Sequence, residues 1–345
     1  MNEYNLDNEK IKRTYFRYLK GAGGKSSNTI DKVRLAIHEF EKFTKFADFR
    51  KFYDKQAEDF KEYLAAKPTR HGNGTLSKST QFHTVKALRN FFKWLTDKPG
   101  YYKLRKRLDD IDYLKLSLKD ERIAKGTASI DFPTLEQIRA VIFSMPSSND
   151  IEKRNRALIA IAILTGARIN ALISLRLKHI DIDRELVRQN PAEVKTKFSK
   201  AIDTYFFPVG DDIKAIFIDW YKYLIETKLY GNNDPLFPRT KLSLDKNQSY
   251  CSDGLEKEFW QTTQPAREIF KQAFENAGLS YYNPHSFRRT LVHFCEMVCK
   301  TPAEFKAVAQ NLGHENVSTT FSSYGYIDPC RQGELIKNLE QKTKE

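Results

Sequence analysis

Apolar residues in the first hundred positions recur every three or four residues, the spacing of one face of a helix. The last of these stretches begins after Ser77, a residue type that caps helix N-termini, and ends at a Lys98-Pro99-Gly100 stop. The first three helices are predicted over about residues 8–20, 28–46 and 55–66. The pattern therefore predicts a four-helix, all-α N-terminal region.

From about residue 130 the pattern of apolar positions becomes mixed. Thr134 and Gln137 fit a capping box, and the most apolar stretch of the chain, ALIAIAILTGA, lies in a predicted core helix over about 151–165. Short β-like runs are predicted over 179–182, 186–188 and 203–209. Further helices are predicted over 211–228, 265–277, 286–299 and 302–312.

These two patterns predict two domains in a mainly α protein with a small β-sheet. We expect an all-α domain over residues 1–107 and an α+β domain over 130–345. Residues 108–129 are polar with weak periodicity, and we expect a linker there.

Composition narrows the class of protein. No apolar run approaches the ~18 residues of a membrane span, and the first thirty residues mix charges with aromatics, unlike a signal peptide, so we expect a cytoplasmic protein without membrane contact. The four cysteines are too few and too unevenly spaced for a disulfide framework. Cys295 and Cys299 stand four residues apart on an apolar helix, where we expect buried free thiols rather than a metal site.

Charge points to a polyanionic partner. The net charge is +14, and residues 1–105 hold 23 Lys and Arg against 12 Asp and Glu, whereas the rest of the chain is nearly balanced. The basic residues of this first part are interleaved with aromatics rather than collected in a tail. The N-terminal domain is therefore the expected electrostatic contact with nucleic acid.

Three separated segments carry charged or polar side chains that folding alone does not explain. Arg168 follows the apolar helix, next to a glycine. Pro284 begins a helix that places His285 and Arg288 on one face, and His314 lies between two predicted helices. Guanidinium groups neutralise and orient a phosphate, while His and Lys move the protons of an attacking and a leaving alcohol, so the set suits phosphoryl transfer between hydroxyls.

At these residues the chain resembles the tyrosine recombinases of the phage-integrase family. That family has an Arg in a T-G-x-R-[IV] turn, an H-x-x-R pair, an L-G-H-x-x-[IV]-x-T-T stretch and a Tyr soon after it. The matching segments are T-G-A-R-I at 165–169, H-S-F-R at 285–288, L-G-H-E-N-V-S-T-T at 312–320 and Tyr324. The N-terminal helices are similar in kind to the family's core-binding (SAM-like) domain, and residues 130–345 to its catalytic domain.

The resemblance implies a role for each residue. Arg168 and Arg288 would clamp the scissile phosphate, and His314 would hydrogen-bond a non-bridging oxygen. His285 would support the phosphate and assist proton transfer. Tyr324 would attack, forming a 3′-phosphotyrosyl bond that conserves the phosphodiester energy, so that neither metal nor ATP would be needed.

The family also carries a general-acid lysine on a β-hairpin. Here the turn falls in E-V-K-T-K-F-S-K, residues 193–200, and Lys197 is preferred because it lies near the turn yet flanks a strand. Lys195 and then Lys200 are the alternatives, with phosphate contact as the role of whichever is not the acid. The expected DNA contacts are Lys103, Arg105, Lys106, Arg107, Lys195, Lys200 and Arg289.

Two departures from the family pattern are visible. Ala171 stands where the family commonly has an acid, three residues after the first Arg. One extra residue precedes the tyrosine, so counting from His314 reaches Ser323, although some members share this T-T-x-x-S-Y-G ending, which favours Tyr324. Tyr326 is the other candidate nucleophile and is expected instead to pack at the start of the last helix.

The expected function is site-specific recombination or integration of double-stranded DNA by a homotetramer that is monomeric when free. Because the first helix starts near residue 8, we expect short inverted-repeat sites without distant arm sites. The alternatives are a type IB topoisomerase-like relaxase and a catalytically inactive DNA-binding regulator. A bacterial or archaeal, nucleoid-associated protein is expected, whose amphipathic segment 331–345 packs either in cis or on a neighbouring protomer.

Overall fold

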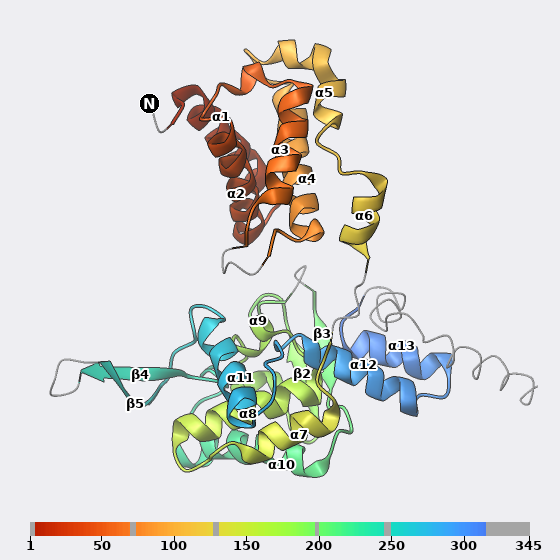
Figure 1. Ribbon diagram of the computed structural model, residues 1–345. Helices are drawn as coiled ribbons and strands as arrows, with labels where there is room; N and C mark the ends of the chain where they lie inside the picture. The colour runs from red at the N-terminus through yellow and green to blue at the C-terminus, as the bar shows by residue number, and fades with distance from the viewer. Residues whose placement is uncertain (1–3, 70–73, 127–130, 197–199, 245–249, 315–345) are drawn as a thin grey trace, which may run out of the picture. The chain divides into compact units, whose positions relative to one another are not determined.

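The computed structural model describes residues 4–69, 74–126, 131–196, 200–244 and 250–314 (Figure 1). The chain divides after Gly126 into two compact units. The described elements of the first are helices, with one isolated β-bridge, and the second combines helices with two small antiparallel sheets, so the predicted fold class is confirmed. None of the helices in the described ranges is long and apolar enough to cross a membrane.

All four predicted N-terminal helices are present. They are α1 (Leu6–Gly21), α2 (Ser27–Phe43), α3 (Asp54–Ala66) and α4 (Lys78–Leu95). Ser77 caps α4 as predicted, since its hydroxyl accepts the N–H of Thr80 at 3.2 Å. Phenylalanines fill the core between the helices, and the rings of Phe52 and Phe92 stack with centroids 4.1 Å apart.

The expected linker contains structure of its own. After a 3₁₀ segment (Tyr102–Arg107), α5 (Leu108–Asp112) and α6 (Leu118–Lys125) belong to the N-terminal unit. Ile111 and Leu114 are fully buried in its core, while Asp112 forms an ion pair with Arg89 at 2.8 Å. One buried residue in α5 and one in the turn that follows it produce little periodicity, which is why the pattern favoured a linker.

The second unit is built around α8 (Asp150–Thr165), in which every residue from Ala157 onward is buried. The predicted capping box begins α7 (Leu135–Ser144): the Thr134 hydroxyl accepts the N–H of Gln137, and the Gln137 side chain accepts the N–H of Thr134. The remaining helices are α9 (Ile169–Leu172), α10 (Asp211–Lys222), α11 (Gln264–Asn276), α12 (Ser286–Val298) and α13 (Pro302–Asn311). The predicted helix over 211–228 is α10 followed by a π-helical turn (Tyr223–Thr227).

The three β-like runs form one antiparallel sheet. Its strands are β1 (Ile180–Asp181), β2 (Leu186–Gln189) and β3 (Ile202–Tyr205), in the order β1-β2-β3. Leu186 pairs with Tyr205 and Gln189 with Ile202, which leaves β3 at the edge.

A second sheet was not predicted. It is the hairpin of β4 (Arg239–Leu244) and β5 (Tyr250–Glu256), which extends away from the helices of its unit (Figure 1). The described side chains along it are exposed or half-buried, so no apolar alternation marks the strands. Buried Arg154 holds its base by donating to the carbonyl of Pro238 at 2.9 Å and the hydroxyl of Thr240 at 3.0 Å.

Candidate active site

Arg168 is placed by a glycine turn at the end of α8. Gly166 ends the helix in the left-handed conformation with φ 58°, and its N–H donates to the carbonyl of Ala162. A Cβ at this position would lie 2.7 Å from a methyl of Leu312 and 2.9 Å from one of Leu291, so only glycine fits. The turn thereby packs directly against α12 and the segment after α13, with Arg168 as the N-cap residue of α9.

Arg288 joins the three segments that carry the motifs. Its side chain lies 5% exposed in the first turns of α12. One terminal nitrogen, Nη1, donates to the carbonyl of Gly166 at 2.6 Å, and Nη2 donates to the carbonyl of Leu312. Nη2 also lies 2.9 Å from Nε2 of His314. The structure therefore brings together Arg288, His314 and the turn that carries Arg168.

The two guanidinium groups lie in an electrostatically unfavourable environment. Burial, followed by the charge of Arg168, lowers the pKa of Arg288 to about 9, and burial also lowers the pKa of Arg168. Among the described residues, neither guanidinium has a carboxylate partner. Because both remain cationic near neutral pH, an anion such as a phosphate diester would stabilise them.

The two histidines occupy different environments. A guanidinium only donates hydrogen bonds, so Nε2 of half-buried His314 accepts from Arg288, which fits a neutral imidazole beside the two cations. His285 is exposed at the start of α12, one turn before Arg288, and its backbone N–H donates to the side chain of Asn283 at 3.0 Å. Arg289 is half-buried beside Arg288.

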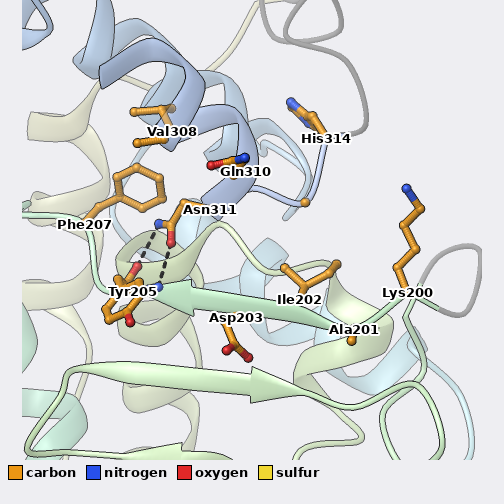
Figure 2. A pocket seen from close by; sticks show the side chains of 12 residues that line it. Lys200, Ala201, Ile202, Asp203, Tyr205, Phe207, Val308, Gln310, Asn311 and His314 are labelled. Atoms are coloured by element: carbon orange, nitrogen blue, oxygen red, sulfur yellow. Dashed lines mark hydrogen bonds between the residues drawn. The ribbon is translucent and has the colours of Figure 1, made fainter. Parts of the chain in front are cut away.

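A cleft of about 670 Å³ adjoins this site between β3 and α13. Figure 2 shows Lys200 and His314 on its two walls at one end, with Phe207 and Val308 at the other end. Lys200, one of the three candidate lysines, therefore lines the same cleft as His314.

The β2–β3 connection, which carries the other candidate lysines, is fixed to the segment that follows Arg168. The backbone N–H of Lys195 donates to the hydroxyl of Ser174 at 2.9 Å, while its side chain is exposed. Two residues earlier, Glu193 pairs with Lys178 at 2.6 Å and contacts buried His179 at 3.0 Å, and hydrogen bonds from Lys178 and then His179 lower the pKa of Glu193 to about 2. Lys197 lies outside the described residues.

Other predicted residues fall in several places. Tyr324, with its neighbours Ser323 and Tyr326, lies outside the described part of the chain. The basic residues predicted to contact DNA from the N-terminal unit are exposed on its 3₁₀ segment: Lys103, Arg105, Lys106 and Arg107. Arg105 is engaged with Asp97 at 2.6 Å.

The departure at Ala171 has a structural context. Its side chain is 1% exposed and packs in the apolar core of the second unit. Ser174, a residue that no motif singled out, supplies a polar contact nearby: its hydroxyl donates to the carbonyl of Ala171 at 2.9 Å and accepts from Lys195. The role of this serine could not be predicted from the sequence, because its partner Lys195 lies 21 residues away.

The two neighbouring cysteines are free thiols, as predicted. Cys295 is buried, and burial followed by the proximity of Cys299 raises the pKa of its thiol to about 12. Within the described ranges, no group of three or more His, Cys, Asp or Glu is arranged to hold a metal ion.

Comparison with known proteins agrees with this geometry. A family model described as the phage integrase family matches residues 131–329. The tyrosine recombinase XerC of Lactobacillus leichmannii is 24% identical over 313 residues, covering 90% of this chain and 92% of that protein. XerC of Natranaerobius thermophilus is 23% identical over 334 residues, covering 95% and 97%.

Solved structures show the same fold. A lambda integrase(75-356) dimer bound to a COC′ core site has a TM-score of 0.59 at 14% identity, covering 93% of this chain and 99% of that one. XerH bound to palindromic difH substrate has a TM-score of 0.58 at 19% identity, covering 95% and 85%. Because the family model spans more than half of the sequence, the chain belongs to the phage integrase family and is a tyrosine recombinase.

Proposed function

We propose that this tyrosine recombinase cuts and rejoins double-stranded DNA at specific sites through a 3′-phosphotyrosyl intermediate on Tyr324. The observation that carries the proposal is the contact of Arg288 with both the Gly166 turn and His314, which assembles two cations and an imidazole. Among the described residues, neither of the two cations has a carboxylate partner. A scissile phosphate would supply the missing negative charge.

The proposed reaction has two balanced steps. In the first, the Tyr324 oxygen attacks phosphorus, the bond to the 5′-oxygen breaks, the phenol proton passes to a base assisted by His285, and the 5′-oxygen takes a proton from Lys197. In the second, a 5′-hydroxyl of the partner strand attacks the phosphorus, the bond to the Tyr324 oxygen breaks, the hydroxyl proton passes to Lys197, and the phenolate takes its proton back from the base. Arg168, Arg288 and His314 stabilise the charge on the non-bridging oxygens in both. Each step exchanges one phosphodiester for another, so ATP is not needed.

The partner is proposed to be duplex DNA carrying inverted repeats around a crossover, bound by four protomers that are monomers when free. Support comes from the exposed basic residues of the N-terminal unit and from the relatives, since the lambda integrase and XerH structures are both complexes with DNA. Charged contacts to phosphates weaken steeply as salt rises, so binding is expected to be strongly salt-dependent. A cytoplasmic, nucleoid-associated location follows from this partner.

A nicked suicide substrate tests the proposed chemistry. When cleavage releases a short fragment that diffuses away, the covalent complex cannot religate and accumulates. We expect a protein–DNA adduct that survives denaturation and is lost on proteolysis. No adduct on any cognate site would contradict the function, whereas relaxation of supercoiled plasmids by monomers without sequence preference would indicate a topoisomerase-like enzyme.

A sulfur-substituted leaving group identifies the general acid. A 5′-thiolate is a much better leaving group than an alkoxide and needs no protonation, so loss of the acid should not slow its release. We expect Lys197→Ala to slow cleavage of ordinary DNA by roughly 10²–10⁴-fold and to cleave 5′-phosphorothiolate DNA at nearly the wild-type rate. Lys195→Ala and Lys200→Ala serve as comparisons. Rescue of either one instead of Lys197→Ala would transfer the role to that residue.

A further inference from the structure

Asn311, the last residue of α13, joins this helix to the edge of the three-stranded sheet. Its side-chain oxygen accepts the backbone N–H of Tyr205 at 2.7 Å, and its side-chain nitrogen donates to the carbonyl of the same residue at 2.9 Å (Figure 2). A neighbouring strand would make the same pair of hydrogen bonds. The amide therefore occupies part of the open edge of β3.

The main chain of Asn311 extends this connection into the sheet. Its carbonyl accepts the hydroxyl of Thr204 at 3.0 Å, and that hydroxyl accepts from the side chain of Gln189 on β2 at 2.9 Å. Thr204 and Gln189 are both buried. Three hydrogen bonds thus fix the end of α13 to β3, and a fourth continues to β2.

The position of this junction relates it to the site. Leu312, which follows Asn311, accepts from Arg288, and His314 comes two residues later. On the other wall of the cleft, β3 begins two residues after Lys200. Between the walls, a Cβ at Gly313 would lie 2.6 Å from the terminal methyl of Ile202, so the two segments are already in close contact.

We propose that Asn311 is a positioning residue, which fixes His314 relative to the β2–β3 connection with its candidate lysines. The proposal rests on the proposed function, since it assigns Asn311 a part in the same reaction. The fold has other anchors at this point: Ala309 and Leu312 are buried, whereas Asn311 is only half-buried. Loss of the amide should therefore disturb the site more than the stability of the domain.

The test compares single and double substitutions on the nicked substrate. Asn311→Ala should slow adduct formation from preformed protein–DNA complex by roughly tenfold to a hundredfold, the effect of displacing a catalytic group by about 1 Å. Its Kd for DNA should stay within about twofold of wild type, because no phosphate contact is removed. The matched control is Asn276→Ala, the same change at the last residue of α11, where the side chain is exposed and makes no hydrogen bond to the described residues.

Coupling to His314 distinguishes positioning from a general structural effect. If Asn311 acts through His314, then Asn311→Ala added to His314→Ala should slow the reaction less than about threefold further. A full additional loss in the double variant, or a wild-type rate in Asn311→Ala, would overturn the proposal. Absence of an adduct with wild-type protein would instead overturn the proposed function.

A second variant keeps the test decisive if Asn311→Ala folds poorly. Asn311→Asp retains the acceptor for the N–H of Tyr205 but places a carboxylate oxygen against its carbonyl, and protonation of that carboxyl restores the donor. The rate of Asn311→Asp relative to wild type should therefore rise as pH falls through the pKa of the new carboxyl. A ratio that does not change with pH would contradict the proposed pairing.

Discussion

Tyr324→Phe is expected to abolish the covalent protein–DNA adduct while leaving DNA binding intact. The change removes only the phenolic oxygen that attacks the phosphorus, so the rate should fall by more than roughly 10³-fold. The ring is retained, and the affinity for a recombination site should stay within about twofold of wild type. Adduct formation on a nicked substrate, followed on a denaturing gel, measures the first effect, and a gel shift with intact DNA measures the second.

The neighbouring residues provide the controls for this result. Tyr326→Phe makes the same chemical change two residues away and should retain the adduct, and Ser323→Ala tests the position that simple counting from His314 reaches. Sequencing the peptide that carries the DNA fragment should identify Tyr324 directly. An undiminished adduct with Tyr324→Phe, or a DNA-linked peptide in which another residue is modified, would refute the assignment.

Arg288→Ala is expected to have the second-largest effect, by losing a phosphate ligand and its connections at once. Removing one donor aimed at a developing charge typically slows a reaction by about 10²–10³-fold. The substitution also leaves the carbonyls of Gly166 and Leu312 without their donor, at about 1–3 kcal/mol for an unsatisfied buried group. Arg288→Lys should rescue little, because an ammonium group lacks the planar fork that reaches two carbonyls together.

Arg154 is a matched control for the stability part of this effect. It is 2% exposed, and burial lowers its pKa to about 10, but it donates to the base of the β4–β5 hairpin rather than to the site. Arg154→Met should lower Tm without slowing adduct formation by the protein that remains folded. The two variants are compared by the rate of adduct formation per folded molecule, with the folded fraction taken from thermal melts. A folded Arg288→Ala protein that reacts at the wild-type rate would exclude the phosphate role.

The sequence predicted the helices and strands in which buried residues recur at a regular spacing along the chain. Helices α1 to α4 and α8 were found because apolar residues line one face or the whole helix. The β4–β5 hairpin was missed because its described side chains are exposed or half-buried, and α5 because only Ile111 anchors it to the core. The hairpin and α5 are held by contacts that produce no regular spacing of apolar residues in the sequence.

For the site, the motifs name residues whose catalytic roles stay predictions. Arg168, Arg288 and His314 could be named from their motifs, and the structure shows the contacts that assemble them. Asn311 could not be named, because its amide pairs with Tyr205, 106 residues earlier in the chain. The assignments of Lys197 and Tyr324 lie outside the described residues and stay predictions.

The pair of cations at Arg168 and Arg288 affects the stability of the protein without substrate. A folded domain ordinarily neutralises a buried charge with one of its own carboxylates, but here the described chain supplies none to either guanidinium. In the free enzyme the two guanidinium groups therefore repel each other, and selection for stability alone would be expected to remove this repulsion. Under the proposed function, a phosphate of the DNA would supply the missing negative charge, and binding of substrate would then also raise the resistance of the protein to unfolding.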